Sequence, residues 1–145
     1  MSRIIAIDPG RKKCGLILAD LQTRQILEGR VVDESIVLRL IDVWIGQNSV
    51  EKILLGNGTS SQDWKKLLDG LASIDMVDEK GTTFRARQRY WELWPPSIWI
   101  RWIPRGMILP SDNLDAVAAL LLLEDYFNQK FSWEDSPNFK TLLVL

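Results

Sequence analysis

The stretch RIIAIDPGRKKCGLILA (residues 3–19) decides the fold of this chain. Two short apolar runs, residues 4–7 and 14–19, flank Asp8-Pro9-Gly10 and a basic triplet. Apolar runs of this length, separated by turn residues, predict two buried strands that pair back on each other. A carboxylate at the end of a buried strand is costly to leave without a partner or a cation. Asp8 is therefore the first candidate functional residue.

The composition predicts one domain of a soluble protein. The chain has 145 residues, 46% of them hydrophobic, and a net charge of -1, which suits a single core but gives no overall basic field for nucleic acid. A single cysteine, Cys14, excludes an intramolecular disulfide and favours a reducing compartment. The chain shows no signal-peptide pattern at its beginning and no apolar run near the ~20 residues of a membrane span. The expected location is the cytoplasm.

The chain contains no histidine. This absence excludes Ser-His-Asp and Cys-His catalysis, and it excludes zinc sites with histidine ligands. Acid–base chemistry or metal binding would have to use carboxylates, whose oxygen atoms favour Mg²⁺ or Mn²⁺.

Strand and helix patterns alternate along the chain. The expected strands are residues 4–7, 15–19, 25–32, 52–55 and 74–77. The expected helices are residues 35–46, residues 61–71 after a Ser60-Ser61 cap, a helix capped by Thr82 or Thr83 and ended by Pro95-Pro96, and a helix from Ser111 or Asp112 to Phe127. This order predicts an α/β fold with a mixed five-stranded sheet, in which an antiparallel meander is continued by two parallel strands and helices cover both faces. We expect one domain over residues 1–128 and a C-terminal tail over residues 129–145.

Acidic residues are expected to converge at one edge of this sheet, where the parallel strands end. Asp8 ends the first strand, Glu79 follows the fifth, and Asp112 and Asp115 lie in the first turn of the last helix; Asn57 follows the fourth strand. Carboxylates in one pocket repel one another unless cations neutralise them. Two cations ~4 Å apart are a common device for cleaving phosphodiester bonds.

Four segments in matching order carry a family resemblance. They are IIAIDPG (residues 4–10) with Gly15, GNGTS (56–60), VDEKGTT (77–83) and DNLDAVAA (112–119). Together they resemble motifs of the RuvC and YqgF (RuvX) group of RNase H-like nucleases, over roughly residues 3–127. The second segment also looks like its equivalent in the YqgF-like domain of the transcription accessory protein Tex.

The resemblance implies an RNase H-like fold and a Mg²⁺- or Mn²⁺-dependent nuclease acting on Holliday junctions or on precursor 16S ribosomal RNA. It implies catalytic and metal-binding roles for Asp8, Glu79 and Asp115, with Asp112 as a fourth ligand and Asp8 bridging two ions. RuvC enzymes place a glutamate after the fourth strand, where this chain has Asn57, so Glu79 is expected to act as in YqgF proteins. The residues expected to contact nucleic acid are Arg11, Lys12, Lys13, Asn57, Arg85 and Arg89.

Other readings remain open. The chain could be a catalytically inactive nucleic-acid-binding module like the Tex domain, or one lobe of a sugar-kinase or actin-like ATPase, although that fold needs two lobes. Asp112 could serve as a helix cap, and Asp115 could favour the helix dipole. The Trp-rich segment, residues 91–102, suits base stacking, core packing or a homodimer contact. Neither DNA nor RNA is excluded as substrate.

Overall fold

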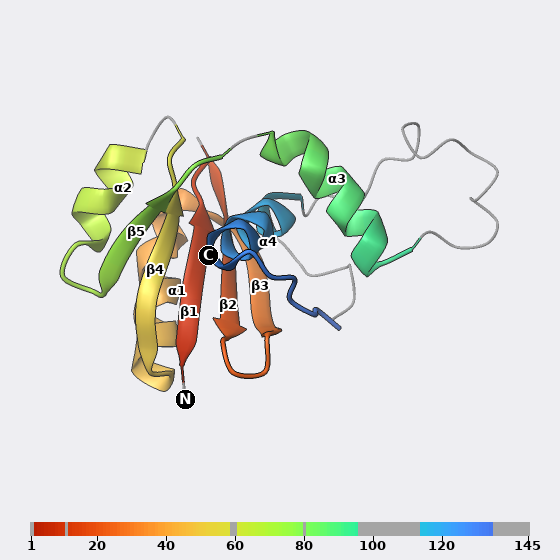
Figure 1. The fold of residues 1–145 in the computed structure, drawn as a ribbon. Coiled ribbons are helices and arrows are strands. Elements are labelled where there is room, and N and C mark those ends of the chain that lie inside the picture. Colours follow the sequence, from red (N-terminus) through yellow and green to blue (C-terminus); the bar gives the residue numbers. More distant parts are fainter. Residues whose placement is uncertain (1, 11, 59–60, 80, 96–113, 135–145) are drawn as a thin grey trace.

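The computed structural model describes residues 2–10, 12–58, 61–79, 81–95 and 114–134 (Figure 1). Its strands are β1 (Arg3–Asp8), β2 (Lys13–Asp20), β3 (Gln25–Asp33), β4 (Val50–Gly56) and β5 (Ser73–Val77). They form one sheet in the order β3-β2-β1-β4-β5. β2 pairs antiparallel with both β1 and β3, whereas β1, β4 and β5 run parallel to one another. The predicted mixed sheet is confirmed.

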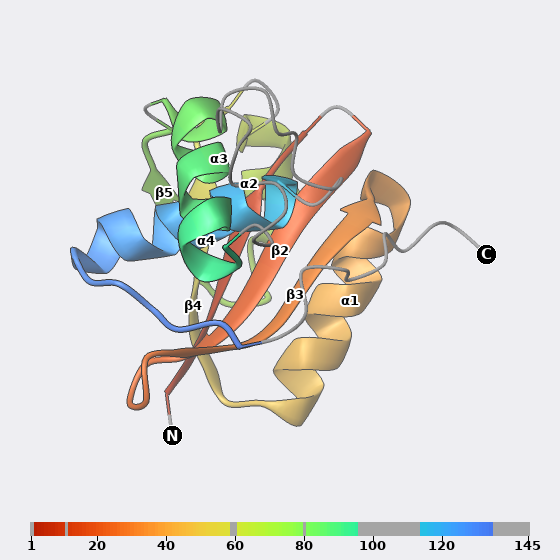
Figure 2. The same ribbon diagram turned by 90° about the vertical axis from the view of Figure 1, so that its right-hand side faces the viewer.

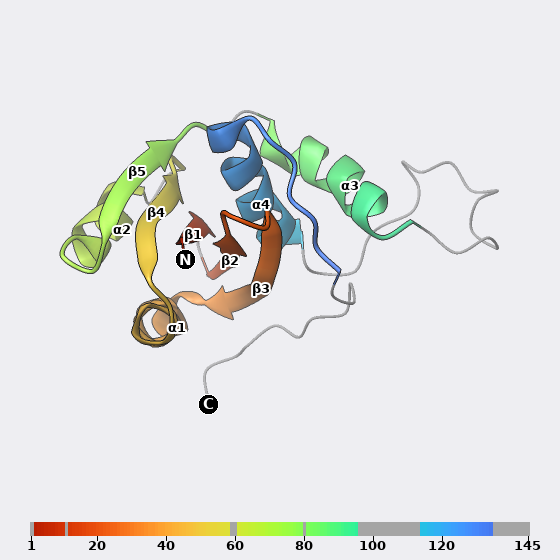
Figure 3. The same cartoon turned by 60° about the horizontal axis from the view of Figure 1, so that its bottom comes forward.

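Helices cover both faces of the sheet, as predicted (Figures 2 and 3). They are α1 (Glu34–Gln47), α2 (Ser61–Leu68), α3 (Thr82–Leu93) and α4 (Leu114–Phe127). Side chains alternate along β1, so that Ile5 and Ile7 join the core under α1 and α2, while Ile4 and Ala6 join the core under α4. Because both faces are covered, β1 is apolar along its whole interior rather than alternating with polar residues.

α4 is the central helix of its face. It lies directly on the sheet, and α3 packs against its outer side (Figure 3). Residues 116–124 of α4 are all buried. A helix with neighbours on both sides needs apolar residues all round, which explains the run of alanines and leucines that the sequence places there.

Two helix ends differ from the sequence-based expectation. α2 ends at Leu68, and Gly70 then takes a positive φ of 96° that reverses the chain. The N-cap of α3 is Gly81, with φ 60°, a residue that has no side chain to cap the helix. The expected cap by Thr82 or Thr83 was wrong because glycine adopts the left-handed conformation at little steric cost.

Part of the predicted tail belongs to the core. Phe131 and Trp133 are 3% and 4% exposed, and Ser132 forms a bridge to Gln25 beside β3. Packing therefore continues past the predicted boundary at residue 128, to Trp133. Within the described residues, no helix is long and apolar enough to cross a membrane.

Candidate active site at the carboxyl edge of the sheet

Three of the four predicted acids lie at or near the ends of secondary-structure elements. Asp8 is the last residue of β1, Glu79 follows β5 by two residues, and Asp115 lies in the first turn of α4. The carboxyl ends of β1, β4 and β5 lie at the upper edge in Figure 1. The predicted fourth acid, Asp112, lies outside the described residues.

Asp8 and Glu79 form a carboxyl–carboxyl contact. Burial, hydrogen bonding to Glu79 and the negative charges of Glu79 and Asp115 raise the pKa of Asp8 to about 8. Two carboxyl groups can hydrogen-bond only when one of them holds a proton. Oε1 of Glu79 is buried and receives no hydrogen bond from another side chain or backbone group among the described residues. The pair therefore needs a proton or a cation to be stable.

The loop after β4 forms a cradle for Glu79. A Cβ atom on Gly56 would lie 2.1 Å from Oε1 of Glu79, and one on Gly58 would lie 2.9 Å from Oε2. Between these glycines, Oδ1 of Asn57 accepts a hydrogen bond from the Glu79 backbone N–H at 3.0 Å. The structure thus shows Asn57 as a positioning residue for Glu79. Its predicted contact with nucleic acid has no support in this geometry.

Asp115 is positioned by close backbone packing. A Cβ atom on Gly15 would lie 1.9 Å from the carbonyl oxygen of Asp115, so only glycine allows α4 to approach β2 this closely. Gly15 is also the register partner of Asp8 across the β1–β2 pair. Burial raises the pKa of Asp115, and the positive charge of Lys13 opposes that rise. Among the residues predicted to bind phosphate, Lys13 is therefore one whose positive charge acts on an acid of this edge.

No family model matches the chain. Two curated relatives from Bacteroides fragilis, strains ATCC 25285 and YCH46, carry the name "Putative pre-16S rRNA nuclease". Each is 32% identical over 104 residues, which cover 61% of this chain and 74% of the relative. The chain belongs to the YqgF-type pre-16S rRNA nuclease family.

A solved structure supports the fold of this YqgF-type chain. RuvC of T. thermophilus in complex with a Holliday junction substrate aligns with a TM-score of 0.50 and 16% identity, over 88% of this chain and 96% of RuvC. At this identity the likeness shows the RNase H-like fold, and the expected fold class is confirmed.

The carboxyl edge of the YqgF-type chain fits a divalent cation in its chemistry. Its acidic side chains offer only oxygen ligands, which Mg²⁺ and Mn²⁺ prefer. The unsatisfied Oε1 of Glu79 and the raised pKa of Asp8 are both features that a bound cation would relieve. As the side chains stand, however, no three acidic or cysteine residues in the described segments enclose an ion position.

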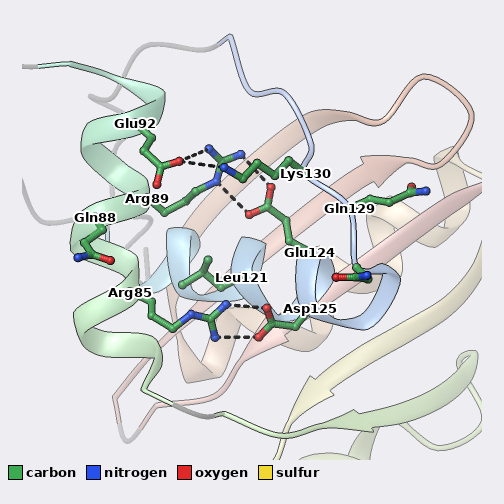
Figure 4. Close-up of a pocket in the computed structure, with 10 residues that line it drawn as sticks. Arg85, Gln88, Arg89, Glu92, Leu121, Glu124, Asp125, Gln129 and Lys130 are labelled. Atoms are coloured by element: carbon green, nitrogen blue, oxygen red, sulfur yellow. Dashed lines mark hydrogen bonds and ion pairs between the residues drawn. The ribbon is translucent and has the colours of Figure 1, made fainter.

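Two predicted nucleic-acid contacts of the YqgF-type chain are engaged elsewhere. Arg85 forms a two-bond ion pair with Asp125, at 2.9 and 2.6 Å. Arg89 is 9% exposed and binds Glu124 at 2.9 and 2.8 Å. Both pairs line a cavity of about 410 Å³ between α3, α4 and the segment after α4 (Figure 4). Arg89 therefore joins α3 to α4 through Glu124, and its contact with nucleic acid stays a prediction.

This cavity is distant from the acidic edge. Glu124 follows Asp115 by nine residues along α4, which corresponds to about 14 Å at the rise of an α-helix. The two described tryptophans of the Trp-rich segment also pack internally: Trp91 contacts Tyr90 edge to face, and Trp94 contacts Trp133 in the same way. The other two, Trp99 and Trp102, lie outside the described residues, as does Arg11. The homodimer remains a prediction.

The YqgF-type protein without metal should lose stability as pH rises from about 4 to about 8. The pKa of Asp8 is about 8 in the folded chain, against 3.8 ordinarily, so the folded state holds this proton more tightly than the unfolded state. The resulting stabilisation is complete below pH 3.8 and is lost as pH rises through 8. The lowered pKa values of Asp20, Asp33 and Asp75 act below pH 4 and do not mask this trend.

Thermal melting in a chelator checks this expectation. Asp8→Asn should flatten the pH dependence and raise Tm at pH 8 by about 3 °C or more, which corresponds to about 1 kcal/mol for a chain of this size. Adding Mg²⁺ at pH 8 should raise Tm of the wild type more than that of the variant. A Tm of the wild type that stays level between pH 5 and 8 would contradict the raised pKa.

Proposed function

We propose that this protein is a divalent-cation-dependent nuclease that hydrolyses phosphodiester bonds in precursor ribosomal RNA. The observation that carries the proposal is the half-buried Asp8–Glu79 pair, which needs a shared proton or a cation to hold it together. The name of the Bacteroides fragilis relatives favours precursor 16S rRNA as the substrate.

Asp8, Glu79 and Asp115 are the proposed catalytic residues and metal ligands, with Asp112 as the fourth. Bound cations would supply a Lewis acid for the phosphate and would lower the pKa of the attacking water. Glu79 is held ready by the Gly56 and Gly58 backbone and by Asn57. This preorganisation lowers the cost of assembling the site when substrate arrives.

Lys12 and Lys13 are the proposed phosphate contacts. Both are exposed at the start of β2, beside Asp8, and the charge of Lys13 reaches Asp115. Exposed lysines that approach a backbone phosphate contribute affinity without reading sequence. We therefore expect the protein to recognise the shape of its substrate more than its sequence.

A cleavage assay tests the proposal. Wild-type protein is incubated with a precursor 16S rRNA fragment that carries a terminal extension, and separately with a four-way DNA junction, in Mg²⁺, in Mn²⁺ and in EDTA. We expect cleavage of the RNA with either cation, no cleavage in EDTA, and recovery when cation is restored. Binding to the RNA without cleavage under all conditions would support the inactive binding module instead. Cleavage of the junction alone would overturn the choice of substrate.

A further inference from the structure

Phe84 is conspicuously exposed. It lies in the first turn of α3, and 67% of its surface is accessible, more than for any other large apolar residue in the described segments. Its neighbours Ala86 and Tyr90 face the core, so the helix is well seated and Phe84 lies on its outer side. Leaving a phenyl ring in water forgoes about 1.5–3 kcal/mol of burial, which suggests a partner for it.

An arginine without an ion pair among the described residues lies three positions after Phe84 on the same helix. α3 carries three arginines, of which Arg85 and Arg89 bind carboxylates of α4. Arg87 is exposed and has no ion pair with any carboxylate in the part of the chain that the structure describes. Residues three apart on a helix are neighbours, so Arg87 and Phe84 share one outward face of α3.

This face begins only a few residues after the acidic edge. α3 begins three residues after Glu79, and Figure 1 shows its first turn at the edge where β4 and β5 end. Four residues lie between Glu79 and Phe84, and the five steps of chain from one to the other can span at most about 18 Å. A nucleic-acid strand whose phosphate lies at the acids would therefore pass Phe84 within a few nucleotides.

We propose that Phe84 and Arg87 form a platform for the single-stranded RNA flank of the cleavage site. This inference rests on the proposed nuclease function. Phe84 stacks on one base, and Arg87 contacts a neighbouring phosphate. An exposed aromatic ring beside a cation suits single strands, because every base has a face that can stack and the backbone supplies negative charge.

Fluorescence binding measurements test the platform. The RNA carries 2-aminopurine at successive positions of a single-stranded flank, and the protein carries Asp8→Asn so that cleavage does not consume the probe. We expect quenching at one or two positions next to the cleavage site. Phe84→Leu should abolish the quenching and weaken binding about 10-fold, whereas Phe84→Trp should retain both. Arg87→Gln should reduce the salt dependence by about one phosphate contact.

Matched controls separate the platform from general effects. Leu67→Ala removes another exposed apolar side chain, on α2, and Arg39→Gln removes another exposed cation, on α1; neither should change quenching. Unchanged quenching in Phe84→Leu would overturn the platform, and so would equal weakening on an RNA whose flank is fully paired. If wild-type protein cleaves nothing but Phe84→Leu still loses quenching, the nuclease proposal fails and the platform stands.

Discussion

Asp8→Asn is expected to lower cation-dependent cleavage at least about 100-fold. Asp8 is in contact with Glu79, and the negative charges of Glu79 and Asp115 both raise its pKa. Loss of a group that merely supports a metal ligand costs 10–100-fold, and loss of a ligand should cost at least as much. Asparagine keeps the shape of the side chain while removing the charge. Single-turnover cleavage of the precursor RNA measures the effect.

Binding should respond in the opposite sense. Above pH 8 in a chelator, where Asp8 is ionised, removing its negative charge lowers the repulsion of the phosphate backbone, so the variant should bind RNA as tightly as the wild type or more tightly. Asp42→Asn is the matched control, because Asp42 is exposed on α1 and distant from the acidic edge. Cleavage by Asp8→Asn within tenfold of the wild type would exclude Asp8 from the catalytic set.

Glu124→Ala should lower the free energy of unfolding by about 3–5 kcal/mol. Glu124 is 8% exposed and accepts hydrogen bonds from Nε and Nη2 of Arg89 and from the Phe131 backbone N–H. Removing one partner of a buried ion pair leaves the other charge without compensation. The loss should also detach the segment after α4 from α3. Urea unfolding followed by circular dichroism measures the change.

Two comparisons sharpen this expectation. Asp125→Ala removes the partner of Arg85, but that pair is more than one third exposed and should contribute no more than about 1 kcal/mol. The double variant Arg89→Met with Glu124→Leu replaces the buried pair by apolar side chains and should recover much of the lost stability. If Glu124→Ala and Asp125→Ala proved equally mild, the buried pair would not be what joins these elements.

The sequence predicts the sheet and the gathering of acids for clear physical reasons. Apolar runs bounded by turn residues mark β1 and β2, and parallel strands must end at a common edge, which places Asp8 near Glu79. The start of α4 could be assigned to the same edge because the last helix has to cover the open face of the sheet. The exact contact between Asp8 and Glu79 needs three-dimensional packing.

The sequence predicts the partners of α3 poorly. Arg85, Arg87 and Arg89 look alike in the chain, and their acidic partners on α4 lie 35 to 40 residues further on. Only tertiary structure separates the two that pair from Arg87. The hydrogen bond of Asn57 to Glu79 was not predictable for a related reason, because an amide in a glycine-rich loop suits either a phosphate or a backbone N–H. A signal for the core position of Phe131 and Trp133 was present, since two aromatic residues two apart favour an extended, buried segment.

The absence of a side chain at Gly15 affects how this protein can evolve. Main-chain atoms of β2 and α4 approach each other directly there, so the start of α4 is placed by backbone contact as well as by the apolar residues of the core. Selection should therefore act on Gly15, because a single methyl group there would displace α4, which carries Asp115.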